Sequence, residues 1–332
     1  MSNDLQTNTA VIKQKRFFAK RKNATAFFLD NIVWLLLLIS LIVMGLINPV
    51  FFTRQILGNI LVQSSILGVL AAGLSFAILI GEIDLSIVGI TAFAAACGTM
   101  LMKAGLNWIL AILVMVLIGI LIGTLNGVLV AKLKAVSLIE TLAVQIALLG
   151  AVMAMTQGRS IVNFSDAYKF VGQGSVFGFP VLPIIFILVY IVVNLVWKRT
   201  TFGRSLFAVG GNASSAHVSG IKVDRIKIYA FLVSGGLAGF SGFLLSSYMG
   251  AVTSTFGTEY IMYSIAAAVI GGISLSGGRG KISGVLGGVL LLTVIQIGLQ
   301  ILGISSYFVQ LSGGMMIFVA VIIDAIRLKL QG

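Results

Sequence analysis

Stretches of about 20 mostly apolar residues follow one another through almost the whole sequence, and each is long enough to cross the hydrocarbon core of a bilayer as a helix. Hydrophobic residues make up 59% of the chain and charged residues only 9%, which excludes an ordinary soluble domain. We therefore predict an all-α polytopic membrane protein with about ten transmembrane helices. The predicted spans are 32–52, 56–80, 85–102, 107–131, 137–157, 180–197, 227–250, 260–275, 282–302 and 307–325.

The positions of Lys and Arg predict the orientation of these spans. If the N-terminus is cytoplasmic and the spans alternate, every Lys and Arg except Arg54, Lys103, Arg159 and Lys169 falls on the cytoplasmic side. Short cytoplasmic loops of membrane proteins carry such an excess of basic residues. Both termini are therefore expected in the cytoplasm, and the net charge of +13 needs no nucleic-acid partner to explain it.

The spans divide the chain into three parts. Residues 1–31 form a basic cytoplasmic tail, 32–326 the transmembrane domain with its largest internal cytoplasmic loop at 198–226, and 327–332 a short cytoplasmic tail. No small-residue cleavage site follows the first apolar run, so this run is read as a signal anchor and not as a secretory signal.

The 198–226 loop contains the signals of a very short helix. Asn212 is a good N-cap, residues 213–219 can form about two turns, and Gly220 suits the left-handed position that ends a helix. A helix of this length is not stable alone in water. It is either held between the membrane domain and a partner, or it is a solvated connector.

Five segments stand out in order along the chain: GEIDLSIVGI (81–90), GTLNGVLVAKLK (123–134), TQGRSI (156–161), GRSLFAVGGNASSAHVSGIKVDRIK (203–227) and IAAAVIGGISLSGGRGKISGVLGG (265–288). All five resemble signatures of bacterial ABC importer permeases for monosaccharides of the ribose and xylose type. The resemblance extends from about residue 45 to the C-terminus.

This resemblance implies a type II importer permease in the bacterial inner membrane. Its partners would be a second permease subunit, identical or different, two ABC ATPase subunits and an extracytoplasmic sugar-binding protein. ATP and magnesium would bind to the partner ATPase, with no cofactor on this chain. A branched-chain amino acid permease or a nucleoside permease is the nearest alternative, and an ion-coupled secondary transporter is a more distant one.

The resemblance also places the contact with the ATPase on the short cytoplasmic helix. The residues assigned to this contact are Gly211, Asn212, Ala213, Ser214, Ser215, Ala216, His217 and Gly220. The family often has acidic residues within this helix, where this chain has Ser214 and Ser215, so contact with the ATPase is expected through shape and helix-end hydrogen bonds.

No catalytic chemistry is predicted for this chain. The Gly-rich stretch SGGRGK at 276–281 fails the phosphate-loop pattern, because Leu275 replaces the first Gly and Ile282 replaces the Ser or Thr that would hold magnesium. Cys97 is the only cysteine and His217 the only histidine, so no metal site is expected, and Cys97 is assigned to packing.

Polar residues near the spans are the candidates for a translocation path. Burying them in lipid is energetically unfavourable, so those that occur there are expected to have a function. The assigned path residues are Glu82, Asp84, Asn126, Thr141, Gln145, Gln296 and Gln300. Asp84 either caps the third span from a cytoplasmic turn or belongs to a helix break that lines the path. Glu140 is a further acidic candidate, and Glu259 is assigned to binding-protein docking or an outer gate. No dense aromatic cluster is visible, so most sugar selectivity is expected in the binding protein.

Glycines spaced four residues apart predict close helix packing in lipid. Three such ridges are Gly119, Gly123 and Gly127; Gly235 and Gly239; and Gly280, Gly284 and Gly288.

Overall fold

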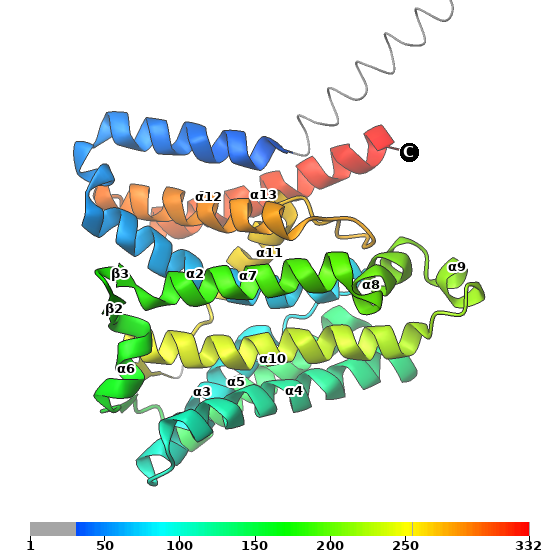
Figure 1. The fold of residues 1–332 in the computed structure, drawn as a ribbon, viewed down its shortest axis with the longest axis horizontal. Helices are drawn as coiled ribbons and strands as arrows, with labels where there is room; N and C mark the ends of the chain where they lie inside the picture. Colours follow the sequence, from blue (N-terminus) through cyan, green and yellow to red (C-terminus); the bar gives the residue numbers. More distant parts are fainter. Residues whose placement is uncertain (1–30, 254, 332) are drawn as a thin grey trace, which may run out of the picture.

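The computed structural model describes residues 31–253 and 255–331, and this part of the chain is almost entirely helical (Figure 1). The predicted tail at 1–31 lies outside the described residues except for its last residue. The elements after the first helix, Asn31–Ile47, are η1 (Pro49–Phe52), α2 (Arg54–Leu79), α3 (Ile87–Lys103), α4 (Trp108–Lys132), α5 (Ser137–Thr156), β1 (Ile161–Val162), α6 (Asp166–Gln173), β2 (Ser175–Val176), β3 (Phe179–Pro180), α7 (Val181–Arg199), α8 (Thr201–Gly211), α9 (Ala213–Val218), α10 (Val223–Met249), β4 (Ala251–Val252), α11 (Tyr260–Ile270), α12 (Ile282–Ile301) and α13 (Ser306–Gln331).

Among the described residues, six helices are long and apolar enough to cross a membrane. They are α2, α4, α5, α7, α10 and α12. The first helix, α3 and α11 are apolar but have only 10 to 17 residues. The predicted helical, multi-span class is therefore confirmed, whereas the count of ten spans is not.

Two of the shorter helices end before the predicted spans do, for local reasons. The first helix stops at Ile47 because Asn48 and Pro49 start a 3₁₀ turn, in which the Asn48 side chain accepts a hydrogen bond from the Val50 N–H at 3.0 Å. α11 stops at Ile270 because Gly271 and Gly272 follow, and Gly272 has a φ of 90° that only glycine adopts readily.

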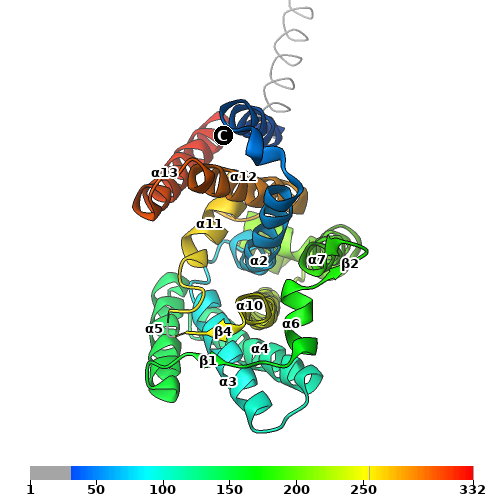
Figure 2. The same ribbon diagram turned by 90° about the vertical axis from the view of Figure 1, so that its left-hand side faces the viewer.

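α2 and α10 lie near the centre of the helix assembly (Figure 2). α10 packs on α4, α2 and α3, and α2 also packs on α12, α7 and α11. In α2, 83% of the most apolar stretch is buried inside the protein, against 11% in α5. α2 is therefore an inner helix, and α5 leaves most of its apolar surface for lipid or another subunit.

α4 and α10 pack closely against each other through two of the predicted glycine ridges. A Cβ atom on Gly119 would lie 2.1 Å from the Gly235 carbonyl oxygen, and one on Gly239 would lie 2.3 Å from the Met115 carbonyl oxygen. Such distances leave no room for any side chain, so the backbones touch directly. α12 packs on α11 in the same way through Gly284 and Gly288. Gly280 lies outside this ridge because it precedes the helix.

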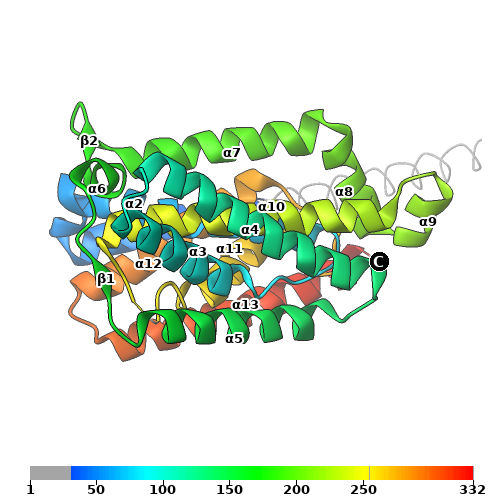
Figure 3. The ribbon, with the colours of Figure 1, turned by 90° about the horizontal axis from the view of Figure 1, so that it is seen from below.

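The two ends of the helix assembly differ in structure (Figure 3). One end carries α6, the antiparallel pair of β1 with β4, and the hairpin of β2 with β3. The other end carries α8 and α9, and α8 is a helix within the segment 198–226 that the sequence predicts as a loop with a single short helix.

Candidate functional site

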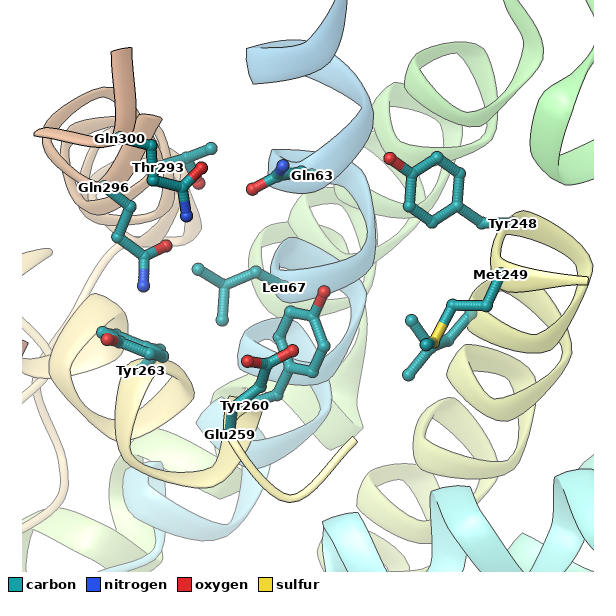
Figure 4. A pocket seen from close by; sticks show the side chains of 11 residues that line it. Gln63, Leu67, Tyr248, Met249, Glu259, Tyr260, Tyr263, Thr293, Gln296 and Gln300 are labelled. Atoms are coloured by element: carbon teal, nitrogen blue, oxygen red, sulfur yellow. The ribbon is translucent and has the colours of Figure 1, made fainter. Parts of the chain in front are cut away.

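A pocket of about 240 Å³ opens between α2, α10, α11 and α12 (Figure 4). Its lining is mostly polar and aromatic. The residues are Gln63, Leu67, Leu245, Tyr248, Met249, Glu259, Tyr260, Tyr263, Thr293, Gln296 and Gln300.

The pocket lies toward the end that carries α6 and the β2–β3 hairpin, because its residues come from matching ends of the four helices. Gln63 is in the first half of α2, Tyr248 is near the end of α10, Tyr260 starts α11, and Gln300 is near the end of α12. A second hollow, of about 430 Å³, shares Glu259 and Gln300 with it and extends toward α13. The two hollows also share Tyr263 and Gln296, and we call these two neighbouring hollows the recess.

The pocket offers many neutral hydrogen-bonding groups. Each glutamine amide provides both donors and acceptors, and each tyrosine adds a hydroxyl group beside an apolar ring. Gln296 and Tyr263 are half-buried, while Glu259 and Gln300 are exposed at the mouth. A pocket of this composition suits a small, neutral molecule with several hydroxyl groups.

A separate polar cluster is buried where the chain passes irregularly from α2 to α3. The Asp84 carboxylate is fully buried. It accepts hydrogen bonds from the Ser86 N–H at 3.1 Å, the Ser86 hydroxyl at 2.5 Å and the Ser234 hydroxyl of α10 at 2.8 Å. The Asn126 amide of α4 lies 2.7 Å from Ser86 Oγ and 3.2 Å from Glu140 Oε1 of α5.

Side chains of α5 complete the hydrogen bonding of this irregular segment. Thr141 Oγ1 accepts from the Leu85 N–H at 3.0 Å, and Ser137 Oγ accepts from the Ile83 N–H at 3.3 Å. Glu82 forms a half-buried ion pair with Lys227 of α10. The cluster therefore ties the α2–α3 connection to α4, α5 and α10.

The predicted short helix is present as α9. Asn212 Oδ1 accepts from the Ser215 N–H at 2.8 Å, which confirms the N-cap, and Gly220 has the expected left-handed φ of 83°. Ala216 is the buried residue of α9, whereas Ser214, His217 and Val218 are exposed. A basic groove beside α9 is lined in part by Lys132, Lys134, Lys222 and Arg225.

Comparison with known proteins identifies the family. Residues 56–320 match the family described as "Branched-chain amino acid transport system / permease component". The chain belongs to this permease family. No solved structure matches it.

Several relatives resemble this permease over nearly their whole length. The ribose import permease protein RbsC of Haemophilus influenzae is 37% identical over 302 residues, which cover 90% of this permease and 94% of the relative. RbsC of Bacillus subtilis is 37% identical over 87% of this permease and 90% of the relative. The D-allose transport system permease protein AlsC of Escherichia coli is 34% identical, and the match covers 97% of this permease and 99% of the relative.

The permease brings together only part of the residues predicted for the path. Gln296 and Gln300 line the pocket, and so does Glu259, which the sequence analysis assigned to binding-protein docking or an outer gate. Glu82, Asp84, Asn126 and Thr141 belong to the buried cluster instead, and Gln145 packs on α3 at Gly89. The Asp84 carboxylate accepts from the N–H of Ser86, the residue before α3, and no side-chain hydrogen bond caps this helix, so both roles considered for Asp84 stay predictions.

Sequence reasoning missed the aromatic part of the pocket. Tyr260 and Tyr263 are three residues apart, which puts them on one face of α11, and this spacing was readable. Tyr248 and Gln63 join them only through the packing of α10 and α2, for which the sequence held no local signal.

Proposed function

We propose that this permease is the membrane subunit of an ATP-driven importer that carries a monosaccharide into the cytoplasm. The observation that carries the proposal is the similarity, over nearly the full length, to permeases named for ribose and D-allose. An L-arabinose permease of Azospirillum brasilense, 32% identical over 86% of this chain, adds a third monosaccharide.

The pocket supports a sugar over a branched-chain amino acid as the substrate. An amino acid would bring a carboxylate, and no Lys or Arg is among the residues that line this pocket in the described part of the chain. Sugar hydroxyl groups would find hydrogen-bonding partners in three glutamines and three tyrosines, and the tyrosine rings could pack on the apolar face of a sugar ring.

The rest of the importer follows from the family. Two ATPase subunits would bind ATP and magnesium and would contact α9 of each of two permease copies, identical or different, through residues 211–217 and Gly220. A binding protein would deliver the sugar on the outside, near Glu259 and the recess. Ten spans with both termini in the cytoplasm would then place α9 inside and the pocket toward the outside.

The test is purification of the tagged permease in mild detergent, followed by reconstitution with the proteins that accompany it. We expect an ATPase and a binding protein to co-purify. Proteoliposomes should then take up one of ribose, D-allose or L-arabinose only with ATP, and neither leucine nor uridine. Uptake driven by a sodium or proton gradient without ATP would overturn the proposal.

A variant of the pocket refines this test. Gln296→Leu keeps the approximate size of the side chain but removes its hydrogen-bonding groups. We expect half-saturation of uptake at a sugar concentration at least several-fold higher. Gln55→Leu changes an exposed glutamine outside this pocket and should leave half-saturation unchanged.

A further inference from the structure

Three segments of the permease meet backbone to backbone beside α9. They are the end of α2, the end of α8 and the 276–280 loop between α11 and α12. The Gly278 N–H donates a hydrogen bond to the Leu79 carbonyl oxygen at 2.8 Å. We call this contact of Leu79, Gly210, Gly211, Gly277 and Gly278 the glycine junction.

The glycine junction has no room for a side chain. A Cβ atom on Gly210 would lie 1.8 Å from the Leu79 carbonyl oxygen and 2.4 Å from the Gly278 nitrogen. One on Gly278 would lie 2.4 Å from the Gly211 nitrogen. All these neighbours are backbone atoms, which cannot rotate away as a flexible side chain could.

The loop that enters the junction has a defined shape of its own. Gly277 and Gly278 have φ angles of 83° and 71°, and the Gly277 N–H donates to the Ser274 carbonyl oxygen at 3.0 Å. The Ser274 N–H in turn donates to the Arg279 carbonyl oxygen at 3.1 Å. This Gly-rich stretch does not match the phosphate-loop pattern. Its glycines instead allow the loop backbone to lie directly against the backbones of α2 and α8.

The junction connects the α8–α9 segment to the helices that form the pocket. α2 carries Gln63 at one end and Leu79 at the other, while α11 and α12 carry Tyr263 and Gln296 and are joined to each other by the loop. α10, the fourth pocket helix, follows α9 directly in the chain. The glycine junction and the chain connection to α10 therefore link the α8–α9 segment to each of the four helices that line the pocket.

We propose that the glycine junction transmits movement from the α8–α9 segment to the pocket helices, and so couples ATP hydrolysis to transport. This inference rests on the proposed function. Tightly packed backbone transmits displacement with little compression, because protein interiors pack as densely as organic crystals. A Cβ atom in the junction would separate the α8 end from α2 and from the loop.

The test compares Gly210→Ala and Gly278→Ala in the complete complex of permease, ATPase and binding protein in proteoliposomes. We expect both variants to retain the ATPase through purification and to hydrolyse ATP within two-fold of the wild-type rate. Sugar taken up per ATP hydrolysed should fall at least ten-fold.

Two control variants separate the steric effect of a Cβ atom inside the junction from other effects of an added methyl group. Gly150→Ala adds it inside helix α5, where nothing lies within 4 Å, as a match for Gly210→Ala. Gly303→Ala adds it at a φ of 73° in open space, as a match for the left-handed Gly278. Both controls should keep the wild-type ratio of uptake to hydrolysis.

Each other outcome overturns the inference. An unchanged ratio in Gly210→Ala and Gly278→Ala would show that the junction transmits nothing. If both variants lost the ATPase or failed to fold, Gly277→Ala would be added, whose Cβ would lie 2.7 Å from the Gly81 nitrogen. If Gly277→Ala also lost the ATPase or failed to fold, the junction would be needed for folding or assembly and not for transmitting movement. Failure of the proposed function is distinct, because wild-type proteoliposomes would then show no ATP-driven uptake.

Discussion

The Asp84 carboxylate is an example of a buried acid that hydroxyl and amide groups satisfy. Asp84→Ala would leave the Ser86 N–H and the two serine hydroxyls without their acceptor. We expect a loss of about 2 to 3 kcal/mol in the free energy of unfolding, since unpaired buried polar groups are that unfavourable. Asp84→Asn keeps one oxygen for Ser86, and the Ser234 hydroxyl can accept from the new amide. Thermal unfolding in detergent should therefore rank Asp84→Asn close to wild type and Asp84→Ala well below it.

A surface aspartate provides the control for this comparison. Asp166 is exposed and forms an ion pair with Lys169 at 2.9 Å. The hydrogen bond from Lys169 lowers the pKa of the Asp166 carboxyl, which is therefore ionised at neutral pH. Asp166→Asn and Asp166→Ala should both unfold at the wild-type temperature, because exposed pairs contribute little. If Asp84→Asn were as destabilising as Asp84→Ala, the negative charge itself would be required at this position.

At the scale of elements, α6 is attached to the end of α10 by a compact set of hydrogen bonds. Ser247 Oγ donates to the Tyr168 carbonyl oxygen at 2.6 Å and accepts from the Gly172 N–H at 2.7 Å. The Tyr168 hydroxyl lies 2.5 Å from Ser246 Oγ, and burial raises its pKa well above the usual range, so it stays protonated. The next residue, Tyr248, lines the pocket. The position of α6 therefore affects the pocket wall.

Removing this attachment should change both stability and transport. Ser247→Ala leaves the Gly172 N–H without its acceptor, and we expect a loss of about 1 to 3 kcal/mol in the free energy of unfolding. The sugar concentration that gives half-saturation of uptake should also change, because a displacement of α6 would move the neighbouring Tyr248 in the pocket wall. Ser40→Ala is the matched control, since among the described residues the Ser40 hydroxyl bonds to the Leu36 carbonyl oxygen of its own helix. Wild-type unfolding and uptake in Ser247→Ala would show that α6 is held by other contacts.

The elements also show which features were predictable from the sequence. The sequence was sufficient to predict α9, because Asn212 and Gly220 cap the helix through residues next to them in the chain. It was also sufficient to predict the ridge that includes Gly119, because its four-residue spacing is visible in the sequence. α8 was not predicted because only Gly203, Leu206 and Val209 of its residues are buried, and the glycines near both of its ends favour a loop. The contact of Gly210 with Gly278 joins the end of α8 to the loop between α11 and α12, which are far apart in the sequence, and no periodicity predicts such a contact. The burial of Asp84 likewise depends on helices that pack around it.

At the scale of the whole molecule, two fully exposed positions mark its opposite ends. Val218 of α9 has a relative exposure of 88%, and Phe177 at the tip of the β2–β3 hairpin one of 104%. α7 separates them, running from the hairpin at one end to α8 at the other (Figure 1). If α7 crosses the membrane once, these two residues lie on opposite sides.

Cysteine labelling tests this orientation directly. In a Cys97→Ser background, which has no other cysteine, Phe177→Cys should react with a membrane-impermeant maleimide added to intact spheroplasts, and Val218→Cys should not. In inside-out vesicles the pattern should reverse, because the excess of Lys and Arg places the α9 end in the cytoplasm. The Cys97→Ser background alone gives the unlabelled baseline. Labelling of both positions from the same side would mean that α7 does not cross the membrane, and the pocket and α9 could then not face opposite compartments.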